Sequence, residues 1–224
     1  MKKGTSFYFS TFEFRSTMTK AIILDLDNTI YPVQSIGDAL FAGLFALIEV
    51  SGEVDDRINE VKREIMRRPF QLVAREFDFS DDLTAAGFNL LKNLEYVGPI
   101  SPFPDYSLVR KMELKKFLVT TGFVKLQESK IRGMQIGKDF EKIFIVDPAQ
   151  SSKTKKDVFA EIVWKNGYEK KEVLVVGDDP ASEIRAALDL GLPVVMYDAL
   201  NMHPDETKVS KITNYAELKN YLVI

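Results

Sequence analysis

Five short runs of consecutive apolar residues recur along the chain. They cover residues 21–24, 117–119, 143–146, 173–176 and 193–196. Continuous apolar runs of this length are typical of strands that are buried on both faces of a sheet. Helical patterns separate the last four runs, at residues 122–134, 154–164 and 180–190. Repeated strand–helix–strand units indicate a parallel sheet with helices on both faces, so the pattern predicts an α/β fold.

Residues 33–100 interrupt this rhythm, because they contain no strand-like run. Within them, the apolar residues at positions 40, 41, 44, 45 and 48 have the i, i+3, i+4 spacing of one amphipathic helix. Further helices are expected at residues 55–67, 70–77 and 81–94. We therefore expect a small helical insert between the first and second strands.

Proline-containing stretches flank this insert and suit its two connectors, Tyr31-Pro32 on one side and residues 99–104 on the other. The expected organisation is a core made of residues 19–32 and 101–224, with a helical domain at 33–100. Residues 1–18 show no sustained periodicity and are expected to form an N-terminal extension.

The composition narrows the chemistry that the chain can perform. Its 224 residues are 46% hydrophobic and 28% charged, which suits a globular protein with a sizeable core. Its 30 basic and 33 acidic residues give a formal charge of −3, which argues against a general nucleic-acid binder. The chain has no cysteine and one histidine, His203, so it has no cysteine nucleophile or thiolate metal site. Carboxylates and other oxygen ligands are expected to carry any catalysis.

The chain also shows no convincing membrane or targeting segment. Its longest uninterrupted apolar run, at residues 39–48, is too short to cross a bilayer. The apolar stretch near the N-terminus is broken by polar residues, unlike a signal peptide. We expect a cytoplasmic protein with no membrane or nucleic-acid partner, present as a monomer or homodimer.

Polar residues follow four of the five apolar runs, beyond the point where each predicted strand ends. In chain order they are Asp25 and Asp27, Thr120 and Thr121, Lys153, and Asp178 and Asp179. Ligands of open parallel sheets bind beyond the carboxyl ends of the strands, which meet at one edge. We therefore expect these side chains to lie close together.

Each group suits phosphate chemistry but also has an ordinary structural explanation. Asp25 and Asp27 leave a strand on the same side, and a hard cation such as Mg²⁺ would relieve their crowding, unless both face solvent. The stretch 120–122 suits a phosphate cradle at a helix N-terminus, or a simple N-cap. Lys153 suits phosphate neutralisation, or a solvated helix start. Their occurrence in order at successive strand ends favours a Mg²⁺-assisted site for a phosphorylated substrate.

With these groups the chain resembles the haloacid dehalogenase (HAD) superfamily of phosphohydrolases, over about residues 19–198. Residues 25–29, Asp-Leu-Asp-Asn-Thr, are similar to the first motif of that superfamily, D-x-D-x-T. Residues 119–122 are similar to its second motif, in which apolar residues precede Thr or Ser.

The third and fourth motifs are also present, each with a departure. Lys153 and Phe159 resemble the K-P-x-x-x-x-F pattern, although Thr154 stands in place of proline. Residues 176–179 resemble the fourth motif, although Glu183 stands where many relatives have a second Asp. This departure leaves open whether Asp179 or Glu183 supports a metal.

The resemblance implies a Rossmann-like core and a helical cap of the C1 type at residues 33–100, as in subclass I of the superfamily. It implies that Asp25 attacks phosphorus and forms an aspartyl-phosphate. Asp27 would protonate the leaving oxygen and then activate water. Because the dehalogenases of the superfamily lack an acid at this position, Asp27 favours a phosphatase over carbon–halogen cleavage.

The resemblance also implies ligands for the substrate and for Mg²⁺. Thr120, Thr121 and Lys153 would hold the phosphoryl oxygens. The expected metal ligands are Asp25, the backbone carbonyl of Asp27, and Asp178, with Asp179 as a further acid.

The expected substrate is a small phosphorylated metabolite. Residues 27–32 look like the pyrimidine 5′-nucleotidase-like branch of the superfamily, which favours a nucleoside monophosphate, and sugar phosphates are equally defensible. Two other functions stay open. One is a sugar phosphomutase, and the other is a catalytically idle binding or regulatory module on the same fold.

Overall fold

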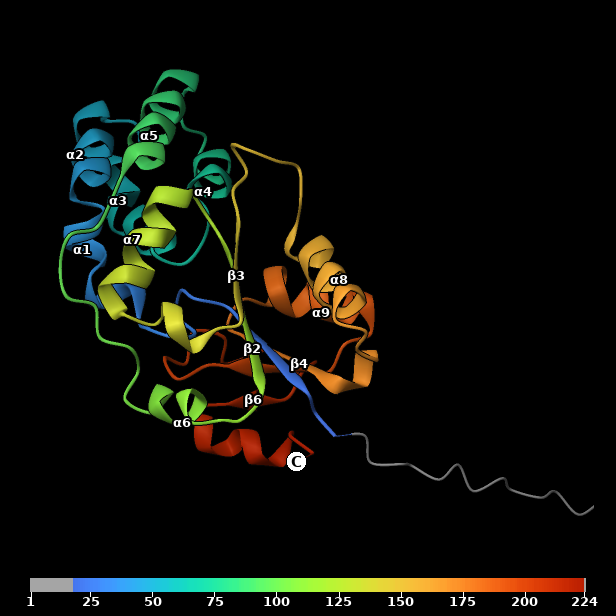
Figure 1. Cartoon of the computed structure of the whole chain (residues 1–224). Helices are drawn as coiled ribbons and strands as arrows, with labels where there is room; N and C mark the ends of the chain where they lie inside the picture. Colours follow the sequence, from blue (N-terminus) through green and yellow to red (C-terminus); the bar gives the residue numbers. More distant parts are fainter. Residues whose placement is uncertain (1–17, 224) are drawn as a thin grey trace, which may run out of the picture.

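The computed structural model describes residues 18–223 of the chain (Figure 1). The expected N-terminal extension, residues 1–18, lies outside the described residues except for Met18. Within the described part, no helix combines the length and the apolar character that a membrane span requires.

A single sheet of six parallel strands forms the centre of the molecule. The strands are β1 (Ala21–Leu24), β2 (Lys115–Thr121), β3 (Lys142–Val146), β4 (Val173–Gly177), β5 (Val194–Tyr197) and β6 (Lys211–Ile212). Their order in the sheet is β3-β2-β1-β4-β5-β6, and every neighbouring pair is parallel. The predicted α/β fold is therefore confirmed, and each apolar run forms a strand.

The sheet is covered on both faces, as its continuous apolar strands require. In β1 the side chains of Ile22 and Leu24 enter one hydrophobic cluster, and those of Ala21 and Ile23 enter another. All four are fully buried. The cluster with Ala21 is closed by the helices α8 (Lys155–Lys165) and α9 (Arg185–Leu190).

The opposite face is covered by three elements that follow residue 105 and by the helices within residues 37–93. The three are α6 (Tyr106–Arg110), α7 (Val124–Met134) and the 3-10 segment η6 (Tyr215–Asn220). Tyr197 of β5 and Tyr215 of η6 stack with their ring centroids 4.3 Å apart. This packing attaches the C-terminal segment to the sheet.

In the described chain six α-helices lie between β1 and β2, and we call the first five of them the helical insert. They are α1 (Gly37–Leu40), α2 (Ala42–Ser51), α3 (Ile58–Ile65), α4 (Phe70–Glu76) and α5 (Asp81–Asn93). In Figure 1 the insert lies to one side of the sheet, next to α7. Phe88 of α5 packs edge-on against Phe123, which precedes α7, with ring centroids 4.9 Å apart.

Parallel strands end at a common edge, and here that edge faces the insert. The residues that follow β1, β2 and β4 line one cavity together with residues of the insert. The fold therefore gathers the polar residues beyond the strands beneath a helical cover.

Candidate active site

Asp25 and Asp27 are positioned by a tight turn at the end of β1. The amide of Ile30 donates to the carbonyl of Leu26 at 2.9 Å. Asn28 adopts a left-handed backbone with φ 53°, and its Oδ1 accepts the amide of Val33 at 3.0 Å. The turn thus directs both acids toward the cavity, which both of them line.

Lys155 holds the carboxylate of Asp25. Its Nζ lies 2.6 Å from Asp25 Oδ1 and 2.7 Å from Glu183 Oε2, and all three side chains are buried. Lys155 is the first residue of α8, which begins with a capping box between Thr154 and Asp157. This cap sets the direction of the helix, so that its first side chain points back toward β1.

The structure therefore differs from the sequence prediction at the lysine. Lys153 precedes the cap, its side chain is 61% exposed, and its Nζ pairs with Glu161 Oε2 at 3.1 Å. It does not line the cavity. Lys155, and not Lys153, contacts Asp25, because Thr154 serves as the N-cap and Lys155 is the first residue of the helix.

Three buried carboxylates, from Asp25, Asp178 and Glu183, offer oxygen atoms that all lie within 4.8 Å of one another. Asp178 Oδ1 accepts the hydroxyl of Thr29 at 3.1 Å. Glu183 belongs to a single π-helical turn, η5 (Pro180–Ile184), and its Oε1 accepts the amide of Asp179 at 2.7 Å. This turn carries Glu183 back to the strand ends, four residues after Asp179.

The pKa values of this acid cluster shift in opposite directions, because burial and mutual repulsion raise two of them and Lys155 lowers the third. Burial raises the pKa of Asp25 to about 7, against the attraction of Lys155. Burial also raises the pKa of Asp178 well above its usual value, and Glu183 adds to this effect. Burial opposes ionisation of Glu183 too, but the ammonium of Lys155 outweighs it and lowers the pKa of that carboxyl.

The acid cluster fits a hard divalent cation. Three carboxylates face one lysine, so the ionised group carries excess negative charge in a buried place. Carboxylate oxygens are the ligands that Mg²⁺ prefers. Asp179 also lines the cavity, but its Oδ1 caps the amide of Ala181 at 2.8 Å and it lies outside the cluster.

The hydroxyl of Thr120 lies at the end of β2 and is buried. Its Oγ1 accepts Gln127 Nε2 at 2.6 Å, and the carbonyl of Thr121 accepts the same nitrogen at 3.2 Å. Gly122 follows with φ 150°, and a Cβ there would lie 3.1 Å from the Gln127 side chain. Glycine therefore permits the close approach of Gln127 to the end of β2.

Asp27 is held by a network that sequence reasoning missed. Lys130 Nζ lies 2.8 and 3.0 Å from its two oxygens, Gln127 Nε2 donates at 3.0 Å, and the Tyr31 hydroxyl donates to Oδ1. Burial favours the neutral acid, but Lys130 and these donors lower the pKa of Asp27 overall. Gln127 and Lys130 lie three residues apart on α7, and both are buried. Two polar residues at that spacing, among apolar ones on the buried side of a helix, were the available signal.

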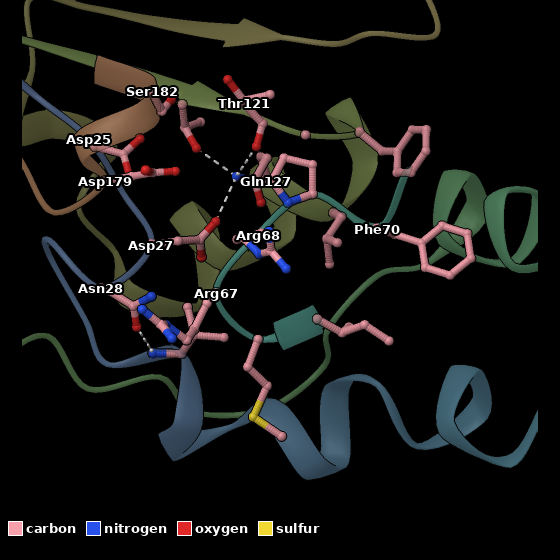
Figure 2. Close-up of a pocket in the computed structure, with 18 of the residues that line it drawn as sticks. Asp25, Asp27, Asn28, Arg67, Arg68, Phe70, Thr121, Gln127, Asp179 and Ser182 are labelled. Carbon is pink, nitrogen blue, oxygen red and sulfur yellow. Dashed lines mark hydrogen bonds between the residues drawn. The ribbon is translucent and has the colours of Figure 1, made fainter. Parts of the chain in front are cut away.

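All predicted site residues except Lys153 line one cavity of about 150 Å³ between the strand ends and the insert. Figure 2 shows Gln127 and Asp27 pointing toward one another inside it. On the insert side the lining residues include Phe41, Arg67, Arg68 and Phe70. The cavity thus combines buried acids and lysines from the core with arginines and phenylalanines from the insert.

The comparisons with known proteins agree with this arrangement. A family model for haloacid dehalogenase-like hydrolases matches residues 19–191. A protein of Methanopyrus kandleri named glyceraldehyde 3-phosphate phosphatase is 27% identical over 195 residues, which cover 80% of this chain and 83% of that protein.

Solved structures show the same fold at lower identity. The L-2-haloacid dehalogenase of Xanthobacter autotrophicus is 15% identical, with a TM-score of 0.58 over 92% of this chain and 100% of that chain. The putative HAD-hydrolase YfnB of Bacillus subtilis, solved with magnesium bound, is 15% identical, with a TM-score of 0.54 over 93% and 100%.

Proposed function

The chain belongs to the haloacid dehalogenase-like hydrolase family, and from this premise we propose that it is a Mg²⁺-dependent phosphatase of small phosphorylated metabolites. The observation that carries the proposal is the contact of Lys155 with Asp25, inside a cluster of three buried carboxylates. A second acid, Asp27, lies two residues along the chain in the same cavity. The relative from Methanopyrus kandleri, named as a phosphatase, supports this choice among hydrolase reactions.

In the proposed mechanism, Asp25 is the nucleophile. One of its oxygens attacks phosphorus, the bond from phosphorus to the leaving oxygen breaks, and an aspartyl-phosphate forms. Lys155 orients the carboxylate through its contact with Oδ1, and its charge offsets that of the incoming phosphoryl group. The hydroxyl of Thr120 and the backbone around Thr121 provide further polar contacts at the end of β2.

Asp27 is the proposed acid and base. As an acid it gives its proton to the leaving oxygen, and as a carboxylate it takes a proton from the water that then attacks phosphorus. The contacts of Asp27 with Lys130 and Gln127 stabilise the ionised form that the second step requires. A bound phosphate monoester brings negative charge to the cavity and raises the pKa of Asp27, which favours the protonated form in the first step.

The acid cluster is the proposed Mg²⁺ site. Asp25, Asp178 and the backbone carbonyl of Asp27 would hold the ion, and Glu183 rather than Asp179 would support it. Glu183 is preferred because it belongs to the cluster, whereas an oxygen of Asp179 is engaged by the amide of Ala181. Bound Mg²⁺ reduces the repulsion between a carboxylate nucleophile and a phosphate, and stabilises the charge of the transferred group.

We propose that the helical insert acts as a cap that shields the reaction from water and selects the leaving group. Three-carbon phosphates are the first candidate substrates, because the relative is named for glyceraldehyde 3-phosphate. Nucleoside monophosphates come second. Phe41 and Phe70 line the cavity, but both are buried in the hydrophobic core, so core packing accounts for them without a stacked base.

The test is phosphate release from a panel of three-carbon phosphates, sugar phosphates and nucleotides, with the wild type beside Asp25→Asn. We expect release by the wild type with Mg²⁺, loss of release with EDTA, and recovery when Mg²⁺ is restored. Asp25→Asn should release no phosphate while keeping a folded circular dichroism spectrum. Equal release by both proteins would refute the role of Asp25. Isomerisation of a sugar phosphate without release would indicate a phosphomutase instead.

A further inference from the structure

A second cavity, of about 260 Å³, adjoins the first between the helical insert and the loop after β5. Three residues line both cavities: Asn28, Met66 and Arg67. Asn28 follows the catalytic acids of β1 by one residue, and Figure 2 shows Arg67 on the same side of the first cavity. Arg67 therefore lines both the cavity that contains Asp25 and the second cavity.

The lining of the second cavity carries positive charge, set among apolar residues such as Leu200 and Met202. It includes Gln34, Arg63, Arg67 and Asn201, and none of the described residues that line it is Asp or Glu. The first cavity differs, because its core side carries the acid cluster beside the lysines and arginines that also line it. The two cavities thus suit different parts of one ligand.

The arginines of this region exceed the acids that pair with them. Glu64 is shared by three guanidinium groups, with Arg68 at 2.9 Å, Arg67 at 3.3 Å and Arg63 at 3.9 Å. Only Arg68 has a second carboxylate partner within the described chain, Glu76 at 2.7 Å. Among the described residues, Arg63 and Arg67 therefore have a single carboxylate partner, Glu64, which they share with Arg68.

Arg67 is the better placed of the two to bind a ligand. Its side chain is 30% exposed, and its second terminal nitrogen reaches across to the carbonyl of Met202 at 3.3 Å. Both of its hydrogen bonds are long, whereas a charge-assisted pair with an anion is typically shorter and stronger. An anion between Arg67 and Arg63 would gain the stronger contact without uncovering a buried charge.

We propose that Arg67 binds a second anionic group of the substrate in this cavity, so that the preferred substrate is a phosphate monoester with a carboxylate or a second phosphate at its far end. This proposal rests on the proposed phosphatase function of the first cavity. A guanidinium binds a carboxylate and a phosphate with the same bidentate geometry. Carboxylate and phosphate are therefore proposed together, as one class of ligand for Arg67.

The test compares substrates that differ only in the second charge. One pair is 3-phosphoglycerate and glycerol 3-phosphate, and the other is fructose 1,6-bisphosphate and fructose 6-phosphate. We expect the wild type to favour the charged member of at least one pair in kcat/KM by about tenfold to a hundredfold, the range of a charge-assisted hydrogen bond. The pair that responds identifies the anion.

Variants then assign the preference to Arg67. Arg67→Met should reduce the ratio within the responding pair to about one, mainly through KM, and Arg67→Lys should restore part of it. Arg75→Met is the matched control, because it removes an exposed arginine of α4 that lines neither cavity. A ratio near one in the wild type for both pairs, or a ratio that survives Arg67→Met, would overturn the proposal.

A binding measurement separates this proposal from the proposed function. The dissociation constants of 3-phosphoglycerate and fructose 1,6-bisphosphate are measured by calorimetry with Asp25→Asn, alone and combined with Arg67→Met. We expect at least one ligand to bind about tenfold or more weakly to the double variant. If binding depends on Arg67 but the wild type turns over no substrate, the anion site stands and the phosphatase is rejected. If the wild type turns over substrate but neither binding nor turnover depends on Arg67, the phosphatase stands and the anion site is rejected.

Discussion

Lys155 and Lys153 lie two residues apart in the chain but have entirely different surroundings. Lys155 is 7% exposed between Asp25 and Glu183, and Lys153 is 61% exposed beside Glu161. The N-cap at Thr154 separates them, because the residue after a cap begins the helix whereas the residue before it follows the loop. The chemistry of the site thus depends on which lysine begins α8.

We predict that Lys155→Met lowers kcat/KM by about a hundredfold or more, since it removes charge-assisted contacts worth about 1.5–3 kcal/mol each. Lys153→Met should stay within about twofold of the wild type, as expected for an exposed ion pair. Steady-state phosphate release from both variants provides the comparison. If Lys153→Met were the inactive variant, the position of α8 relative to β1 would have to be revised.

The acid cluster gives the metal-free protein a distinctive response to pH. The folded pKa of Asp25 is raised from 3.8 to about 7, so the folded protein holds this proton more tightly than the unfolded chain does. The stabilisation is complete below the unfolded value and is lost as the pH rises toward 7. Asp25→Asn lacks this titration.

We therefore predict that, in EDTA, the Tm of the wild type falls relative to that of Asp25→Asn between about pH 5 and about pH 7 and then levels off. Thermal melts of the two proteins side by side cancel the acids that lie away from the cluster. A difference in Tm that is constant across this range would show that Asp25 titrates normally in the fold. Mg²⁺ should reduce the loss at the upper end, because a cation favours the ionised cluster.

At the scale of elements, β4 and the π-helical turn η5 fix Glu183 through one glycine. A Cβ on Gly177 would lie 2.2 Å from Glu183 Cγ and 2.3 Å from its Oε1. Glu183 is 1% exposed, so its side chain has little room to withdraw. Glycine at the end of β4 therefore leaves the space that the Glu183 side chain occupies.

We predict that Gly177→Ala displaces Glu183 and weakens Mg²⁺ activation by about tenfold or more, in line with the usual cost of losing a metal-supporting contact. The measurement is the Mg²⁺ concentration for half-maximal phosphate release. Gly43→Ala is the control, since it changes a glycine in the first turn of α2, where a Cβ would meet Leu90 at an ordinary 3.5 Å. Unchanged Mg²⁺ dependence in Gly177→Ala would exclude Glu183 from the metal site.

The elements also show how far the sequence could lead. The apolar runs predicted β1 to β5 because buried parallel strands leave an unmistakable pattern, but β6 has two residues and begins with Lys211. The predicted helix at 180–190 consists of the π-helical turn η5 followed by α9 (Arg185–Leu190). A single wide turn does not change the hydrophobic pattern of the sequence, so it could not be predicted. That turn places Glu183 in the acid cluster, and the proposed preference for Glu183 over Asp179, which motif spacing left open, rests on this placement.

Some residues of the site could also be predicted from the sequence, and others could not. Those that directly follow a strand, such as Asp25 and Asp178, were predictable because the strand ends set their positions. Gln127 and Lys130 were not, because their contact with Asp27 depends on how α7 crosses the end of β1. Arg67 depends on a still larger unit, the placement of the helical insert over the sheet.

At the scale of the whole molecule, the insert and the sheet share one hydrophobic core. Ile22 and Leu24 of β1 belong to the same cluster of buried residues as Leu44 of α2 and Val73 of α4. Separate domains usually meet through smaller and more polar contacts. The continuous core therefore couples the stability of the insert to that of the strands.

We predict that Leu44→Ala destabilises the entire described fold, and not the insert alone. Leu44 is fully buried, and such a truncation costs about 2–5 kcal/mol. Leu72→Ala, at an exposed site of α4, should cost well under 1 kcal/mol and serves as the control.

Hydrogen exchange in low urea distinguishes the two outcomes by reporting on β1 separately from α2. With one cooperative unit, Leu44→Ala accelerates the exchange of the β1 amides as much as that of the α2 amides, because both open by the same global unfolding. Faster exchange confined to the insert would instead make it an independently unfolding lid. In that case the insert could open without disturbing the strand ends, and Arg67 would bind its anion only in the closed state.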